Sequence, residues 1–86
     1  MPIIAAFLGM IIRIFHADHP PPHVHVQYGE HEAIVEILTG DIIKGSLPGR
    51  IKKITKEWLK LRKFEVLKSW QDAQSNKIPR KIKPLE

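Results

Sequence analysis

The spacing of hydrophobic and polar residues changes once along the chain, near residue 46. Before that point, short apolar segments rich in Ile and Val alternate with turn-forming residues such as Gly9, Gly29 and Gly40, a pattern typical of β-strands. The connections between these segments are shorter than the dozen or more residues that a parallel crossover needs. The sequence therefore predicts a small antiparallel β-meander over about residues 3–45.

Beyond residue 46 the apolar positions recur at helical spacing. Four of them lie three or four residues apart and so share one face of a helix: Ile51, Ile54, Trp58 and Leu61. We expect all four to be buried against the sheet. The apolar residues that follow leave this face, so the helix predicted over about residues 48–74 either bends near Lys63 or buries a wider face in its second half.

The segment after the predicted helix contains Pro79 and Pro84, and we expect an extended tail in which Ile82 and Leu85 pack back onto the domain. Together the elements predict an α+β fold, with the meander packed against a long or bent C-terminal helix. A chain of 86 residues is long enough for one domain and too short for two. We therefore expect a single domain over residues 1–86.

Two features of the sequence exclude certain kinds of site and segment. The chain has no cysteine, which excludes disulfides and thiolate metal sites. Its first twelve residues are apolar, but the run stops at Arg13, short of the roughly 20 residues that a membrane helix needs, and no basic residue precedes it as in a secretory signal. We interpret the run as buried strand and expect a cytoplasmic protein that does not enter membranes.

Charge is divided unevenly between the two halves of the chain. Residues 1–46 contain two basic and five acidic side chains, whereas residues 47–86 contain twelve basic and four acidic ones. In the predicted helix, Lys52, Lys56 and Lys60 form a lysine stripe on the face opposite the apolar residues. Such a stripe is typical of a surface that binds the phosphate backbone of RNA or DNA. It is equally typical of the solvated face of an ordinary basic helix, and both interpretations stay open.

The segment His19-Pro-Pro-Pro-His-Val-His25 carries the most distinctive chemistry in the sequence. His23 and His25 lie two residues apart on a predicted strand, so their rings project from the same face. Two such imidazoles can bind one metal ion or act as an acid–base pair. The rigid prolines restrict the position of His19, and Asp18 is a further candidate. We predict that His19, His23 and His25 share one partly exposed pocket at the sheet edge.

Several functions fit this segment. The three histidines are candidate catalytic residues of a metal-independent ribonuclease, with Arg13 or Lys44 as the cation that stabilises the transition state. His19, His23 and His25 are also candidate ligands of zinc or nickel. They can equally face water on a half-solvated strand. Because a histidine in an exposed pocket fills no core volume, we expect His23→Ala to leave the fold intact.

Several short motifs occur together in a familiar order. They are Gly9 through Phe15, Asp18-His19, Pro21-Pro22-His23-Val24-His25-Val26, Gly45-Ser46-Leu47-Pro48, Glu57-Trp58, Trp70 and Lys81-Ile82-Lys83-Pro84-Leu85. In these motifs the chain resembles the uncharacterised prokaryotic family called domain of unknown function 4160. The resemblance extends over nearly the whole chain, and the histidine–proline motif is its most specific part.

The resemblance implies a small cytoplasmic protein for which no activity is established. Members of that family are often encoded beside a second small family, domain of unknown function 2442, which implies a two-gene unit of the toxin–antitoxin type. The chain departs from the family at Ala17, where relatives often have asparagine, and in its more lysine-rich helix. Residue by residue, the family pattern points to His19, Pro21, Pro22, His23 and His25.

From these observations we consider three functions, in order of preference. The first is a binding and regulatory protein, one component of a toxin–antitoxin-like pair, whose partner is a small protein encoded nearby, RNA or DNA. The second is the metal-independent ribonuclease, and the third is a protein that binds a divalent metal. Arg13, Asp18, Lys44 and the lysine stripe are the candidate binding residues in addition to the histidines.

Overall fold

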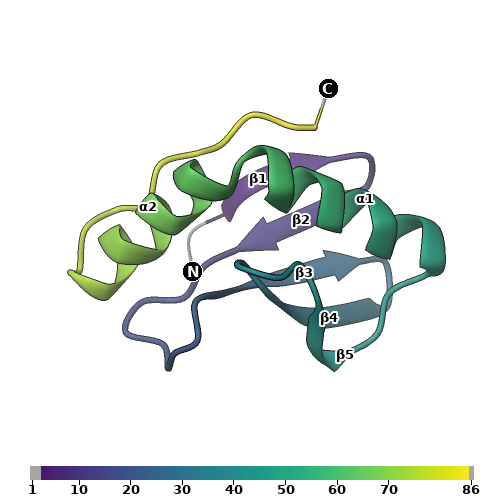
Figure 1. Ribbon diagram of the computed structural model, residues 1–86, viewed down its shortest axis with the longest axis horizontal. Coiled ribbons are helices and arrows are strands. Elements are labelled where there is room, and N and C mark those ends of the chain that lie inside the picture. Colours follow the sequence, from purple (N-terminus) through teal and green to yellow (C-terminus); the bar gives the residue numbers. More distant parts are fainter. Residues whose placement is uncertain (1–2, 86) are drawn as a thin grey trace.

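The computed structural model describes residues 3–85 and has five strands followed by two helices (Figure 1). This arrangement confirms the predicted α+β fold with an antiparallel meander ahead of the helical part. The strands are β1 (Ile3–Phe7), β2 (Met10–Arg13), β3 (His23–Tyr28), β4 (His31–Glu36) and β5 (Ile42–Gly45), and the helices are α1 (Gly49–Leu61) and α2 (Lys63–Gln74).

The sheet follows the order of the chain. Its strands lie in the order β1-β2-β3-β4-β5, and each neighbouring pair is antiparallel. The connection from β2 to β3 is longer than the other turns and contains the prolines at positions 20–22. This β2–β3 loop leaves the sheet at one end and returns to it at His23, where the candidate chemistry begins.

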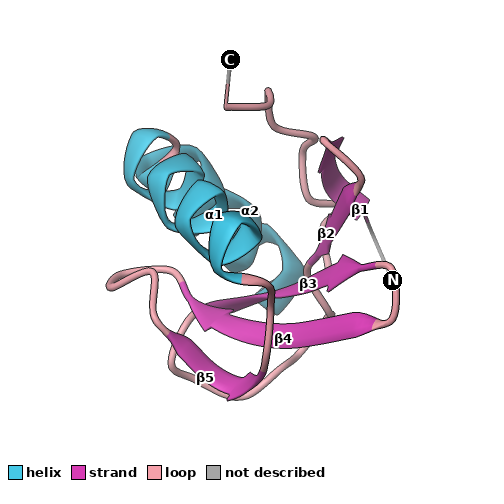
Figure 2. Cartoon of the chain, turned by 90° about the vertical axis from the view of Figure 1, so that its right-hand side faces the viewer, coloured by secondary structure: helices cyan, strands magenta, loops and turns pink. Residues whose placement is uncertain are grey.

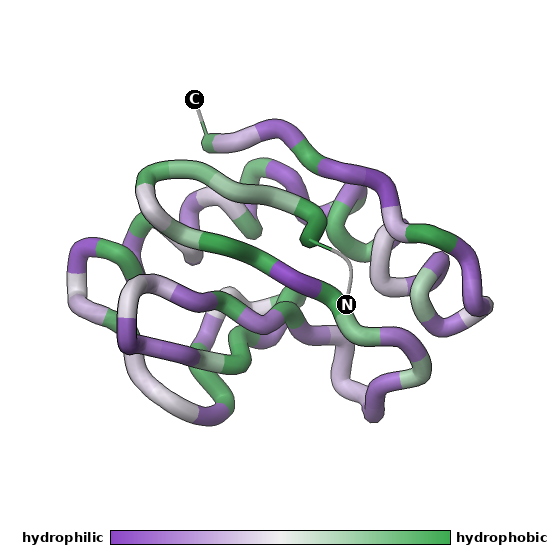
Figure 3. The backbone as a smooth tube through the Cα atoms, turned by 180° about the vertical axis from the view of Figure 1, so that it is seen from behind, coloured by the Kyte–Doolittle hydropathy of each residue, from purple (hydrophilic) through white to green (hydrophobic). Residues whose placement is uncertain are grey.

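The hydrophobic core lies between the sheet and the helices. Both helices pack on one face of the twisted sheet (Figure 2), and the hairpin of β1 and β2 is mostly hydrophobic, as the tube view from behind shows (Figure 3). Strand residues of the inner face are almost fully buried, among them Ile4, Ile12, Val24, Val26 and Val35. No helix in residues 3–85 combines the length and apolar character needed to cross a bilayer.

The helical segment is interrupted at Arg62, which agrees with the first of the two alternatives, a bend near Lys63 or a wider buried face, that the sequence left open. Arg62 has φ −106° and ψ 21°, outside the helical range, and it separates α1 from α2. Trp58 is fully buried, as expected, and Ile51 is buried too, whereas Ile54 is only partly buried against the core. The expectation for Leu61 is wrong, because its side chain is 57% exposed.

Thr55 and Leu59 are buried in place of Leu61. The buried face of α1 therefore includes Thr55 and Leu59. It is rotated about the helix axis relative to the face that the apolar spacing predicted. A threonine can lie there because its hydroxyl donates a hydrogen bond of 2.8 Å to the Ile51 carbonyl, which satisfies the polar group inside the core.

The C-terminal tail packs back onto the domain as predicted. Ile82 is buried and its backbone N–H donates to the Ile4 carbonyl of β1 at 2.6 Å. The indole Nε1–H of Trp58 donates to the Lys83 carbonyl at 2.8 Å, and the Ser69 hydroxyl donates to the Arg80 carbonyl at 3.2 Å. The tail is thus held to β1 and to both helices.

Candidate functional site

Three side chains of the histidine–proline region converge on one point. The Nε2 atoms of His23 and His25 lie 2.8 Å and 3.2 Å from the same carboxylate oxygen, Oδ2 of Asp18. One potential ligand atom from each of the three residues lies within 4.8 Å of the other two. We call Asp18, His23 and His25 the Asp–His–His cluster. His23 and His25 come from β3, and Asp18 comes from the β2–β3 loop.

The end of α2 fixes the loop that carries Asp18. The Gln74 side-chain amide donates to the backbone carbonyl of Asp18 at 2.8 Å, and the Ala17 N–H donates to the Ala73 carbonyl at 3.4 Å. The Trp70 ring of α2 also packs against His23, with 5.0 Å between ring centroids. Residues more than forty positions apart in the sequence therefore set the geometry of the cluster.

The hydrogen-bonding capacity of His23 is fully used. Its Nδ1 lies 2.7 Å from the Pro21 carbonyl oxygen, which can only accept, so Nδ1 carries a proton. A neutral imidazole has one N–H, and in that form Nε2 would present a lone pair to the carboxylate of Asp18. Two atoms with lone pairs do not attract each other at 2.8 Å. The contact is attractive when a proton is shared between the two atoms or when both atoms bind one metal ion.

The surroundings of Asp18 favour the ionised form of its carboxyl group. Burial raises its pKa, but the hydrogen bond from the His19 backbone N–H and the contacts with His25 and His23 outweigh that effect, so the pKa of Asp18 lies below its ordinary value. Hydrogen bonds to the charged form have this direction in general. Asp18 therefore supplies a negative charge to the cluster at neutral pH.

Two expectations about the histidines are wrong. His19 does not join the other two: it is exposed, and the group that shares one point contains Asp18 in its place. His19 contributes its backbone N–H, which donates to Asp18 Oδ1 at 2.9 Å. His23 is not in an exposed pocket, because only 7% of its surface is accessible. Since its ring fills space beside Trp70, His23→Ala does remove packed volume.

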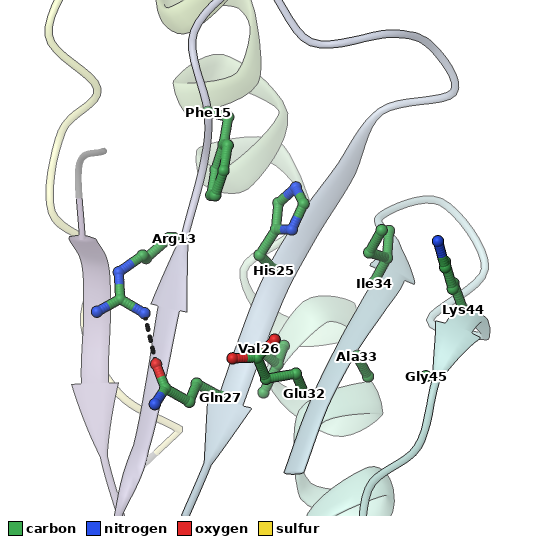
Figure 4. Close-up of a pocket in the computed structure, with 10 residues that line it drawn as sticks. All are labelled: Arg13, Phe15, His25, Val26, Gln27, Glu32, Ala33, Ile34, Lys44 and Gly45. Atoms are coloured by element: carbon green, nitrogen blue, oxygen red, sulfur yellow. Dashed lines mark hydrogen bonds between the residues drawn. The ribbon is translucent and has the colours of Figure 1, made fainter. Parts of the chain in front are cut away.

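A pocket of about 390 Å³ lies next to the cluster, on the sheet face away from the helices. We call it the outer-face pocket, and His25 both belongs to the cluster and lines this pocket. Arg13 and Lys44, which the sequence named as candidate cations, line it as well (Figure 4). The register explains why they meet: Arg13 pairs with His25, His25 with Ile34, and Ile34 with Lys44.

Two neighbours of this pocket were not singled out from the sequence. Phe15 stacks on the His25 ring at a centroid distance of 4.1 Å. Gln27 accepts a hydrogen bond of 2.8 Å from the Arg13 guanidinium through its Oε1 atom. The alternation of β3, which places Gln27 on the same face as His25, was the signal that could have identified it.

The lysine stripe lies apart from this site. Lys52, Lys56 and Lys60 are exposed on α1, and none of them lines the outer-face pocket. Lys56 forms an exposed ion pair with Asp41 at 3.2 Å. The stripe and the histidines therefore do not form one combined surface among the residues described.

The family model of the domain of unknown function DUF4160 matches residues 9–71. That range contains the β2–β3 loop, the Asp–His–His cluster and every residue of the outer-face pocket. No curated protein and no solved structure matches the chain. Because the model covers well over half of the 86 residues, the chain belongs to the DUF4160 family.

Proposed function

We propose that this protein binds one divalent transition-metal ion through Asp18, His23 and His25. The observation that supports this most directly is the convergence of two imidazole nitrogens on one carboxylate oxygen, within 4.8 Å overall. The donation from His23 Nδ1–H to the Pro21 carbonyl supports it further, because metal-binding histidines commonly donate their other N–H to a backbone carbonyl. That bond directs the Nε2 lone pair of His23 toward the site.

The donor set indicates the kind of metal site. Two imidazoles and a carboxylate are the protein ligands of one class of catalytic zinc sites, in which a further coordination position stays open. Imidazole also suits nickel, copper and iron. The bound ion would supply Lewis-acid chemistry at that open position, while Trp70 and the β2–β3 loop hold the ligands in place.

The test compares metal binding in four proteins: wild type, Asp18→Asn, His25→Ala and His19→Ala. Zinc content is measured after reconstitution, and zinc affinity by titration calorimetry. Wild type and His19→Ala are expected to bind one ion per chain, whereas Asp18→Asn and His25→Ala lose it. His19→Ala is the matched control, because His19 lies beside Asp18 in the same loop but outside the cluster.

Thermal unfolding provides an independent measurement. A ligand present at a hundred times its dissociation constant stabilises the folded state by about 2.7 kcal/mol, so a chelator should lower the melting temperature of wild type but not of Asp18→Asn. Zinc binding that is equally strong in Asp18→Asn and wild type would contradict the proposal, as would wild-type protein that takes up no metal.

A metal-independent ribonuclease is a second candidate, favoured by the position of His25. Its Nε2 faces Asp18, and its ring borders a pocket that also contains Arg13 and Lys44. A histidine oriented by a carboxylate is a suitable general base, and Arg13 or Lys44 is the candidate cation to stabilise the pentacoordinate phosphorus of the transition state. RNA cleavage that persists in excess chelator and disappears in His25→Ala would favour this candidate over the metal site.

The expected role in a toxin–antitoxin-like pair predicts a contact with the protein encoded by the neighbouring gene. Phe64, near the junction of α1 and α2, is 84% exposed, and it is a candidate for such a contact because exposed large apolar side chains occur at protein interfaces. Co-expression with the protein encoded by the neighbouring gene is expected to give a complex that Phe64→Ser weakens. Co-purification that Phe64→Ser leaves unchanged would exclude Phe64 as part of the contact.

A further inference from the structure

A second pocket lies where the turn between β4 and β5 meets the helices, away from the residues that line the outer-face pocket. Its volume is about 240 Å³. A Cβ at Gly40 would lie 2.8 Å from Cγ and 3.5 Å from Cα of Lys56, so the turn packs closely on α1 and the two walls of the pocket have fixed relative positions. We call it the turn–helix pocket, and it is lined by Ile37, Leu38, Thr39 and Gly40 of the turn and by Lys56, Leu59, Lys60 and Lys63 of the helices.

The turn–helix pocket is positively charged. Three of the eight described residues that line it are lysines, and none of the eight is acidic. Lys56 forms an ion pair of 3.2 Å with Asp41. Within residues 3–85, no carboxylate lies within ion-pair distance of Lys60 or Lys63, and Lys63 is half-buried. Lys60 and Lys63 are therefore available to neutralise an anion in the pocket.

The size of the pocket and the lysines that lead to it indicate the form of the anion. Pockets that enclose a whole small molecule usually have volumes of about 300–1,000 Å³, so the turn–helix pocket suits one group of a larger molecule. From the pocket the lysine stripe continues along the exposed side of α1 to Lys52. A rise of about 1.5 Å per residue places its successive members about 6 Å apart along the helix axis. Positive charges at regular steps suit a linear chain of anionic groups better than a single small anion.

We propose that the turn–helix pocket binds one phosphate of a nucleic-acid strand between Lys60 and Lys63, and that the rest of the lysine stripe contacts the neighbouring phosphates. An ammonium group binds phosphate as a point charge, and each phosphate that it neutralises releases condensed counterions, which favours binding. Among the described residues, no aromatic side chain and no Asn or Gln amide lines the pocket, so the contacts are with the backbone and carry no sequence information. The inference goes beyond the proposed metal site, because none of the three residues of the Asp–His–His cluster lines this pocket.

The test measures binding of labelled twelve-nucleotide strands, one of uridine and one of thymidine, by fluorescence anisotropy over a range of salt concentrations. Wild type is compared with a pocket variant that combines Lys60→Gln and Lys63→Gln, and with a control that combines Lys77→Gln and Lys81→Gln. The control loses the same charge at exposed positions beyond the end of α2 and outside the pocket. Both strands are expected to bind wild type with similar affinity, because RNA and DNA share the phosphate backbone.

Counterion release gives the expected size of the effect. Each phosphate contact on a single strand contributes about 0.7 to the slope of log affinity against log salt concentration. The pocket variant should therefore have a slope that is shallower by about 1.4, which at about 0.1 M salt corresponds to a loss of affinity of about 25-fold. The control should keep the wild-type slope.

Asp41→Asn tests the pocket in the opposite direction. It removes the carboxylate that neutralises Lys56 and leaves this lysine available to the strand. Affinity should rise by roughly 1.5-fold to fivefold, as expected from the strength of an exposed ion pair. Glu30→Gln is the matched control, because it removes one acidic charge at an exposed position outside the pocket, and it should leave the affinity unchanged. Equal effects of the two changes would contradict the inference.

Three other results would overturn the inference. If the control with Lys77→Gln and Lys81→Gln loses as much affinity and slope as the pocket variant, overall charge and not the pocket determines binding. If polyglutamate displaces the labelled strand as well as unlabelled nucleic acid does, the pocket suits an acidic protein segment and not phosphate. If excess chelator or Asp18→Asn abolishes binding, the strand lies at the Asp–His–His cluster. Failure of wild type to bind zinc, with binding of the strand intact, would refute the proposed function and leave this inference supported.

Discussion

The last residue of β5, Gly45, is the most demanding position of the outer-face pocket, and replacing it with alanine tests how closely β4 and β5 approach each other. Gly45 has φ +85°, a left-handed conformation that costs an L-residue about 1–2 kcal/mol. A Cβ at this position would also collide with the Glu32 carbonyl oxygen and lie 3.0 Å from the Ala33 Cα. Both are backbone atoms, so no side-chain rotation can relieve the contact.

The cost of Gly45→Ala can be estimated from these two contributions. Overpacking that forces backbone shifts typically costs 1–3 kcal/mol, so with the conformational cost the change should lower the free energy of unfolding by roughly 2–5 kcal/mol. A domain of this length has about 4–13 kcal/mol in total. The change should therefore lower the melting temperature by at least about 8 °C and displace Lys44 from the pocket.

Two other glycines separate the contributions. Gly29 also has a positive φ, of +57°, but a Cβ there meets nothing within 4 Å, so Gly29→Ala should cost only the conformational part, about 1 kcal/mol. Gly49 begins α1 in open space, and Gly49→Ala should be neutral or stabilising by up to about 1 kcal/mol. Urea unfolding of all three variants gives the comparison. The reasoning is refuted if Gly45→Ala costs no more than Gly29→Ala.

Three further changes test other parts of the structure. Ala17 has φ +53°, so Ala17→Gly should stabilise by up to about 1 kcal/mol, whereas the same change at Ala6, an exposed β1 residue, should destabilise; equal effects in thermal unfolding would contradict the left-handed conformation. Trp58→Phe removes the donor to the tail and should cost about 1–2 kcal/mol with faster hydrogen exchange at Ile82; unchanged exchange there would contradict the role of this bond. Replacing the whole lysine stripe with glutamine should change stability by less than about 0.5 kcal/mol, because relieved repulsion offsets the lost exposed pair with Asp41; a larger loss of stability by calorimetry would show that the stripe has a structural role.

The sequence carried enough information to predict the architecture. Alternation in β3 and short turns determine an antiparallel meander, and the change of period near residue 46 determines where the helical part begins. The later apolar residues leave the face of Trp58, and this pattern predicted either a bend or a wider buried face without deciding between them. The expectation for Leu61 was wrong because a purely apolar pattern does not include Thr55, which is buried on α1 with its hydroxyl bonded to the helix backbone.

The candidate site was only partly predictable, because contacts between distant residues complete it. Spacing alone placed His23 and His25 on one face. It could not show that Trp70, from α2, covers His23, or that Gln74 holds the backbone of Asp18 and so positions its carboxylate between both rings. The position of His19 depended on the path of the β2–β3 loop, which leaves this residue exposed while its backbone N–H donates to Asp18.

The tail has a consequence for how this protein behaves among copies of itself. An outermost strand offers unpaired backbone groups to which another chain can add, and β1 is such a strand in the described sheet. The tail satisfies one of these groups, the Ile4 carbonyl, and its own prolines and lysines, Pro79, Lys81, Lys83 and Pro84, are residues that discourage further strand pairing. The C-terminal segment therefore protects the edge of the sheet against addition of a strand from a second molecule.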